Sequence, residues 1–235
     1  MYKSKKILAV VPARGGSKRI PKKNLKRING RSLIRIAKEC IDNTKFIDHA
    51  LISSDNDEII KEAKINGLNT YFKRPKTLSG DLIGDIPVLK HALKEAEKKN
   101  NCVFDFVIML QPTAPNRKPS HLHKVIKKIV DEKLDSVWTI HKVEKQFHPD
   151  KQLIINENAK SLEYFTRNGR NITTNQEVGT SFMKNGICYA FSRKHVLNAE
   201  NLLAKINGFI LVKGLIVNID TYKDLKEAKK YLKNK

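Results

Sequence analysis

The chain has 235 residues, of which 46 are Lys or Arg and 24 are Asp or Glu, so its formal net charge is +22. Hydrophobic residues make up 40% of it, which suffices for the core of one sizeable α/β domain. No apolar run approaches the ~18 residues of a membrane span, and the short run before Pro12 lacks a signal-peptide cleavage site. We therefore expect a cytoplasmic protein that has no membrane partner.

The excess of positive charge consists mostly of lysine. Only ten of the 46 cations are Arg, and the cations are spread over the whole chain without interleaved aromatic residues. We therefore expect solvated surfaces that attract anionic substrates, and no dedicated nucleic-acid site. A non-catalytic protein that binds nucleic acid or an anionic glycan is the alternative hypothesis, and it predicts a steep salt dependence of binding.

Short apolar runs alternate with amphipathic stretches along most of the chain. The runs predict strands at residues 6–12, 49–53, 69–72, 104–110 and 136–143. The stretches between them predict helices that begin near Ser32, Asp57, Asp85 and Pro119. This alternation predicts an α/β fold with a doubly wound, mostly parallel sheet, in which ligands bind at the carboxyl ends of the strands.

Residues 144–183 interrupt this alternation, because they are polar and only weakly periodic. We interpret them as an extended arm, such as a hairpin, that packs on a partner subunit, since an isolated hairpin is marginally stable. The core resumes with predicted strands at 187–191, 209–212 and 215–219 and a short helix at 193–198. Thr221 and Asp224 form a capping pair for the last helix. No linker divides the chain, so residues 1–235 are expected to form a single domain.

The loop after the first predicted strand combines positive charge with two adjacent glycines. Gly15 and Gly16 lack side chains that would hold a phosphate away from the backbone. The surrounding cations are Arg14, Lys18, Arg19, Lys22 and Lys23. The loop matches neither G-x-x-x-x-G-K-[ST] nor G-x-G-x-x-G. From charge and glycine content alone, a phosphate site and a solvated turn remain equally open.

Longer motifs resolve this choice, because the chain resembles the acylneuraminate cytidylyltransferases, the CMP-sialate synthetases. The resemblance is carried by ARGGSKRIPKKNLK at 13–26, LISSDNDEI at 51–59, KRP at 73–75, LQPTAPNR at 110–117, DSVWTI at 135–140, NGICYAF at 185–191 and VNIDTYKDL at 217–225. Only the 144–183 segment is poorly matched. The resemblance implies a fold like that of the nucleotide-diphospho-sugar transferases and a homodimer in which this segment reaches the partner. It also implies Mg²⁺-dependent activation of an acidic sugar with CTP.

The resemblance also implies roles for individual residues. The nucleotide and its phosphates would be held by Arg14, Gly15, Gly16, Ser17, Lys18, Lys23, Asn24 and Arg74. The sugar would be contacted by Gln111, Asn185 and Tyr189, and the metal by Asp220, Asn218 and Asp55. Catalysis would rest on Arg14, Lys18, Lys23 and Gln111, because cations stabilise the charge of the phosphate oxygens and an amide hydrogen-bonds a sugar.

The residues themselves also allow structural roles at several of these positions. Asp220 precedes the Thr221 cap and is equally suited to favour the start of the last helix, and Asp55 is equally suited to cap the second helix. Gln111 and Tyr189 fit an ordinary strand end and an ordinary core position.

The chain departs from the family pattern at several positions. Asn218 stands where an Asp is usual, so we expect weaker metal affinity. Other departures, at Asn116, at 175–176 and at 183–184, cluster on the side of the acceptor sugar. The sugar is therefore expected to differ from N-acetylneuraminate, and GTP remains open as an alternative nucleotide donor. A sugar-1-phosphate nucleotidyltransferase is disfavoured, because the first loop lacks G-x-G-x-R.

Overall fold

The computed structural model describes residues 1–233, which form two compact units. The large unit comprises residues 1–139, 185–210 and the segment from 214 onward, and the small unit comprises residues 140–184 and 211–213. The predicted arm at 144–183 falls within the small unit. No helix in the described part of the chain combines the length and apolar character needed to cross a membrane.

The large unit is built on a six-stranded sheet. The strands are β1 (Ile7–Pro12), β4 (His49–Ser53), β5 (Phe106–Met109), β6 (Ser136–Lys142), β9 (Phe182–Ser192) and β10 (Asn207–Leu211), in the order β10-β6-β9-β5-β1-β4. β1 pairs in parallel with both β4 and β5, whereas β9 runs antiparallel to β5. This mixed sheet with its helices confirms the predicted doubly wound α/β class.

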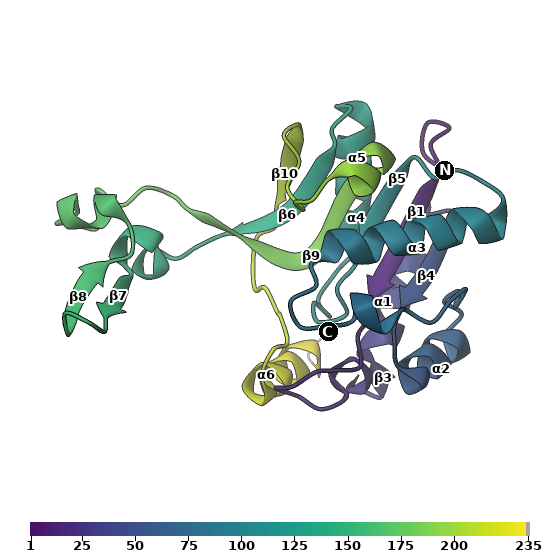
Figure 1. Cartoon of the computed structure of the whole chain (residues 1–235), viewed down its shortest axis with the longest axis horizontal. Coiled ribbons are helices and arrows are strands. Elements are labelled where there is room, and N and C mark those ends of the chain that lie inside the picture. The colour runs from purple at the N-terminus through teal and green to yellow at the C-terminus, as the bar shows by residue number, and fades with distance from the viewer. Residues whose placement is uncertain (234–235) are drawn as a thin grey trace. The chain divides into compact units, whose positions relative to one another are not determined.

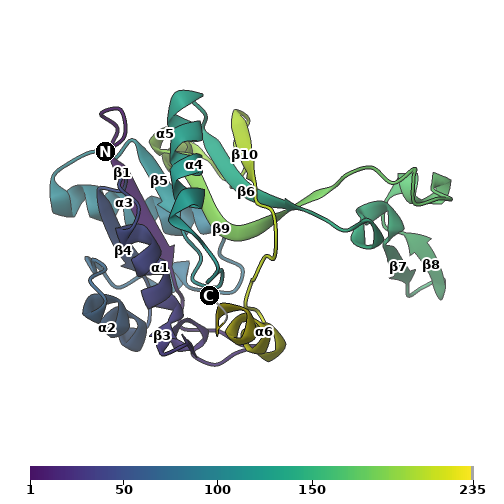
Figure 2. The same cartoon turned by 180° about the vertical axis from the view of Figure 1, so that it is seen from behind.

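Helices flank the sheet, and several of them cover its two faces. They are α1 (Leu33–Asp42), α2 (Asp57–Ile65), α3 (Asp85–Asn100), α4 (Pro119–Asp131), α5 (Arg193–Asn198) and α6 (Tyr222–Lys233). Figure 1 shows α3 and α5 in front of the sheet, and the opposite view in Figure 2 shows α1 and α4 in front of it. β1 is buried between its neighbours, which explains its uninterrupted apolar sequence.

The register of β1 places two strand ends side by side at one edge of the sheet. Val10 lies opposite Leu51 of β4 and opposite Met109 of β5. The loops that follow β1 and β5 therefore start next to each other, at the carboxyl ends of parallel strands. This is the edge at which ligands bind in open α/β sheets.

Three predicted strands differ from the structure. Residues 69–72 form only an isolated bridge between Asn69 and Leu51, and the Asn69 side chain also donates to the Ala50 carbonyl. Residues 215–219 form no strand, and the N–H of Ile219 donates to the carbonyl of Thr113 at 2.9 Å. The run predicted at 187–191 extends over Phe182–Ser192 and pairs antiparallel to β5.

Side-chain caps fix the helix starts. Ser32 Oγ accepts from the N–H of Arg35 at 3.1 Å, as predicted for α1. α2 is capped by Asn56, whose Oδ1 accepts from the N–H of Ile59 at 3.1 Å, and not by Asp55. The predicted pair at α6 is confirmed, since Asp224 Oδ2 accepts from the N–H of Thr221 at 2.7 Å and Thr221 Oγ1 accepts from the N–H of Asp224 at 3.3 Å.

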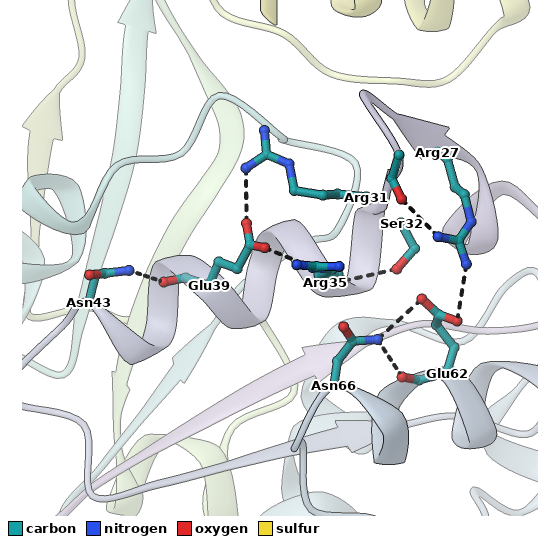
Figure 3. Close-up of polar contacts among 9 residues, drawn as sticks. Arg27, Arg31, Ser32, Arg35, Glu39, Asn43, Glu62 and Asn66 are labelled. Carbon is teal, nitrogen blue, oxygen red and sulfur yellow. Dashed lines mark hydrogen bonds and ion pairs between the residues drawn. The ribbon is translucent and has the colours of Figure 1, made fainter.

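A short hairpin, β2 (Arg27–Ile28) and β3 (Arg31–Ser32), follows the basic loop and is fastened to α1 and α2. Arg31 and Arg35 both contact the carboxylate of Glu39, at 3.0 and 2.9 Å (Figure 3). Arg27 lies 3.8 Å from the carboxylate of Glu62 on α2. These contacts anchor the end of the basic loop on two helices.

The small unit contains an antiparallel hairpin, β7 (Leu153–Asn156) and β8 (Ser161–Tyr164), together with short 3₁₀ turns. A hairpin was predicted for this segment. Several large apolar side chains of the unit are solvent-exposed, including Ile155 at 73% and Leu162 at 67%. Such exposure is unusual for apolar residues that come close together in a small structure.

Candidate functional site

Hydrogen bonds to its main chain hold the basic loop after β1 in place. The N–H of Ala13 donates to the carbonyl of Ser53 at 2.9 Å, and Asn24 Nδ2 donates to the carbonyl of Arg14 at 3.1 Å. The N–H of Gly15 donates to Asp55 Oδ1 at 2.8 Å. A Cβ on Gly15 would lie 2.8 Å from the Cβ of Asn56, so this position requires glycine. The loop is therefore fixed against the end of β4.

A cavity of about 500 Å³ opens beside this loop, within the range of small-molecule sites. Its lining includes nine of the predicted site residues: Arg14, Ser17, Lys18, Lys23, Asn24, Arg74, Gln111, Asn218 and Asp220. The predicted residues Gly15, Gly16, Asp55, Asn185 and Tyr189 are not among its lining residues. The cavity thus joins the first loop, the end of β5 and the segment before α6.

Asp81 lies between two cations of the loop and was not predicted as a site residue. Its Oδ1 is 2.7 Å from Nη1 of Arg14, and its Oδ2 is 2.5 Å from Nζ of Lys18. The hydrogen bond from Lys18 is the main cause that holds the pKa of Asp81 below its usual value. The carboxylate of Asp81 therefore pairs with two of the loop cations that are expected to bind phosphate.

Asp220 contacts the opposite end of the chain. Its Oδ1 lies 3.0 Å from Nζ of Lys23, and its Oδ2 accepts from Asn218 Nδ2 at 3.2 Å. The side chains of Asp220 and Asn218 both line the cavity, so they offer one carboxylate and one amide oxygen to a cation there. Mg²⁺ is commonly held by one or two carboxylates together with substrate phosphates, so this donor set fits the ion.

Asp55, the third predicted metal ligand, does not lie with Asp220 and Asn218 in the cavity lining. It supports the backbone of Gly15, and it lies outside the cavity lining. Within residues 1–233, no cluster of three or more His, Cys, Asp or Glu side chains is arranged to hold a metal. A metal at Asp220 would therefore depend on ligands from the substrate, and Asp55 as a ligand stays a prediction.

Arg74 is a buried cation in the wall of the cavity. Its Nε donates to Ser53 Oγ at 3.0 Å, and its Nη2 donates to the Ser53 carbonyl. Burial lowers the pKa of the guanidinium, while the nearby carboxylates of Asp55 and Asp85 act in the opposite direction. The side chain is 5% exposed, so it contributes a fixed positive charge near the end of β4.

Two predicted sugar contacts, Asn185 and Tyr189, are buried in β9. Asn185 is 3% exposed, and its Oδ1 accepts from Thr139 Oγ1 at 2.6 Å. Tyr189 is 2% exposed, and its Oη accepts from the N–H of Gly186 at 2.6 Å. Burial is the main cause that raises the pKa of Tyr189 to about 12. In this structure both side chains support the turn at Gly186.

Comparison with known proteins gives consistent results. The sequence pattern described as Cytidylyltransferase matches residues 8–230. The chain is 31% identical to the "Post-translational flagellin modification protein B" of Campylobacter coli, covering 97% of this chain and 96% of that protein. It is 29% identical to a pseudaminic acid cytidylyltransferase of Campylobacter jejuni, covering 95% of each chain. It is 30% identical to a CMP-N,N'-diacetyllegionaminic acid synthase of the same species, covering 94% of this chain and 92% of that one.

A solved structure shares the fold at low sequence identity. The structure of CMP:2-keto-3-deoxy-manno-octonic acid synthetase complexed with CTP superposes with a TM-score of 0.72 at 18% identity, covering 97% of this chain and 99% of that one. This likeness supports the same α/β architecture over nearly the whole chain.

Proposed function

We propose, from the premise that this chain belongs to the cytidylyltransferase family, that it transfers a cytidylyl group from CTP to an acidic nonulosonic sugar. The observation that carries the proposal is the shared cavity. The cations of the first loop, the amide of Gln111 and the carboxylate of Asp220 all line it. One cavity thus offers groups suited to a triphosphate, a sugar and a divalent cation.

The donor half of the reaction rests on the basic loop. The anomeric hydroxyl of the sugar attacks the α-phosphorus of CTP, a new P–O bond forms, and the bond to pyrophosphate breaks. Negative charge gathers on the phosphate oxygens and on the departing pyrophosphate. Arg14, Lys18 and Lys23 are placed to stabilise this charge, and the loss of one such contact typically costs ~10²–10³ in rate.

Mg²⁺ is the proposed cofactor. Asp220 would hold it with its carboxylate, and Asn218 would add an amide oxygen. When bound, the ion would neutralise phosphate charge. Because Asn218 carries no charge, we propose a site that relies strongly on the triphosphate for its remaining ligands.

We propose a pseudaminate-like or legionaminate-like sugar as the acceptor, and not N-acetylneuraminate. Full-length relatives named for the first two sugars share 28–30% identity with this chain. The N-acylneuraminate cytidylyltransferase of Escherichia coli shares 22%, and the match covers 51% of that protein. The departures at Asn116 and Lys184 agree with an altered acceptor side.

The test is pyrophosphate release from CTP or GTP with Mg²⁺ and a panel of nonulosonic and octulosonic acids. We expect turnover with CTP and with pseudaminate or legionaminate derivatives. The variant Lys18→Met should lose activity while its fold is unchanged, because Lys18 is 80% exposed. Absence of turnover with every pair of nucleotide and sugar would refute the proposal. The reaction consumes CTP, which agrees with the expected cytoplasmic location.

We also propose a homodimer that uses the small unit. Its hairpin exposes the apolar side chains of Leu153, Ile155 and Leu162, which a second copy of the chain would cover. Light scattering at micromolar concentration should give the mass of two chains. The variant Ile155→Lys should shift the mass to that of one chain, whereas a monomeric wild-type protein would contradict the proposal.

A further inference from the structure

Arg117 is a buried cation that has no acidic partner among the described residues. It is 7% exposed, and no ion pair between Arg117 and a carboxylate is present in the described residues. Burial lowers the pKa of its guanidinium. An unpaired buried charge is costly unless hydrogen bonds satisfy it, so its hydrogen-bond partners indicate what it does.

Within residues 1–233, the three side-chain hydrogen bonds of Arg117 all go to main-chain carbonyls. Nη2 donates to Gln111 at 2.6 Å and to Gly186 at 3.3 Å, and Nε donates to Ile187. Gln111 follows β5, whereas Gly186 and Ile187 lie in β9. The β5–β9 ladder runs from the pair Phe106–Ser192 to the pair Met109–Tyr189. The guanidinium therefore joins the two chain segments just beyond the point where the ladder stops.

The joined segments meet the cavity through Gln111. Gly186 has a φ of +72°, and a Cβ there would lie 2.7 Å from Gln111 Oε1 and 3.9 Å from Asn218 Oδ1. The side chain of Gln111 therefore lies directly against the Gly186 backbone. The N–H of Gly186 also donates a hydrogen bond to Tyr189 Oη at 2.6 Å. Movement of this turn would displace the side chain of Gln111.

We propose that Arg117 is a positioning residue for the acceptor sugar. It fixes the Gly186 turn and thereby the side chain of Gln111, without itself lining the cavity. The inference rests on the proposed function. Arg117 acts on the sugar side, because within the described residues its hydrogen bonds go to Gln111, Gly186 and Ile187 and not to the basic loop.

The planar shape of the guanidinium is essential to this role. Its separate N–H groups reach carbonyls on two segments at once, whereas a Lys ammonium is a compact point charge with a different geometry. Arg117→Lys keeps the positive charge but loses the planar set of N–H donors. Arg117→Gln loses the charge but keeps a planar amide group. If position matters, both variants should impair the use of the sugar. If charge alone matters, Arg117→Lys should behave like the wild type.

The experiment measures steady-state kinetics twice, with the sugar varied at saturating CTP and with CTP varied at saturating sugar. Both variants should lower kcat/KM for the sugar by about 10- to 100-fold, since small misplacements of a substrate have effects of this size. The Kd for CTP, measured by calorimetry without sugar, should stay within about 2-fold of the wild type. A matched control is Arg193→Lys, because Arg193 is paired with Glu97 and lies outside the cavity lining.

Several outcomes would overturn the inference. One is a kcat/KM for the sugar that equals the wild-type value in both variants, or in Arg117→Lys alone. Another is a loss of CTP affinity as large as the loss in kcat/KM for the sugar. Loss of the cooperative thermal transition in both variants would also overturn it, because Arg117 would then hold the fold as a whole. A wild-type protein that binds CTP but turns over no sugar would instead refute the proposed function.

Discussion

The ammonium of Lys23 lies 3.0 Å from Oδ1 of Asp220, which joins two residues 197 positions apart in the chain. The ion pair connects the basic loop after β1 to the segment before α6. Lys23 is predicted to meet the triphosphate, and Asp220 is predicted to meet the metal. A bound cation at Asp220 would therefore share its carboxylate with Lys23 or release the ammonium toward the phosphates.

Asn218 offers a direct test of the metal site. Asn218→Asp adds a second carboxylate beside Asp220, and hard cations bind more tightly as charged oxygen ligands are added. We expect the Mg²⁺ concentration for half-maximal pyrophosphate release to fall by about 3- to 10-fold. Asp220→Asn should raise it and reduce the maximal rate. An unchanged Mg²⁺ dependence in both variants would show that the metal binds elsewhere.

Asp81 should compete with the nucleotide for the loop. Its carboxylate contacts Arg14 at 2.7 Å and Lys18 at 2.5 Å, so a triphosphate must displace it. Asp81→Asn is expected to tighten CTP binding by about 3- to 10-fold at low salt, with a smaller gain at high salt, because the pairs are partly exposed and screened. Calorimetry at two ionic strengths measures the effect.

A matched control for Asp81 is Asp57→Asn. Asp57 forms a similar ion pair with Lys73 at 2.7 Å, but neither residue lines the cavity. This variant should leave CTP affinity unchanged at both ionic strengths. Weaker CTP binding in Asp81→Asn would contradict the competition and would indicate that Asp81 assists the bound nucleotide.

Local sequence patterns account for much of the structure on the basic-loop side of the cavity. The basic loop, the parallel pairing of β1 and the Thr221–Asp224 cap depend on neighbouring residues or on one apolar run, and all three can be recognised in the sequence. Family motifs pointed to Asp220, which local chemistry alone would have interpreted as helix-capping. The structure places it on the cavity wall beside Lys23.

The structure around Gln111 could not be predicted from local patterns, because it depends on the pairing of distant segments. The antiparallel register between β5 and β9 puts Gly186 beside Gln111, and no local pattern encodes that register. Asn185 and Tyr189 stay predicted sugar contacts, and the structure places both side chains in the interior of β9. Asp81 resembles any exposed acid of a loop, so nothing local indicated its position between two cations.

His121 should make stability depend on pH. It lies in the first turn of α4, where its Nδ1 accepts from the N–H of Lys118 at 3.3 Å. Burial is the main cause that lowers its pKa from 6.5 to about 4, and Lys118, Arg117 and Lys124 add to the effect. The native state therefore disfavours the proton more than the unfolded state does.

The direction of this pH dependence follows from proton linkage. Stability from the neutral imidazole of His121 is fully present above pH 6.5 and is lost as the pH falls toward 4. The loss is on the order of 1–3 kcal/mol. Denaturant unfolding of His121→Gln between pH 7 and pH 4 should show a smaller decrease than the wild type. Equal decreases in the two proteins would contradict the assignment, and an NMR titration of the imidazole measures the pKa directly.

The three cysteines should differ sharply in reactivity. Burial is the main cause that raises the pKa of Cys188 to about 12 and that of Cys40 to about 11, whereas Cys102 is partly exposed. A disulfide reagent reacts with the thiolate, so at pH 8 the native protein should show one fast-reacting thiol, with the other two appearing only after unfolding. Cys102→Ser should abolish the fast phase and leave the slow one intact. A fast phase that persists in this variant would mean that β9 or α1 opens readily in the native state, and it would weaken the inference that Arg117 holds a rigid turn.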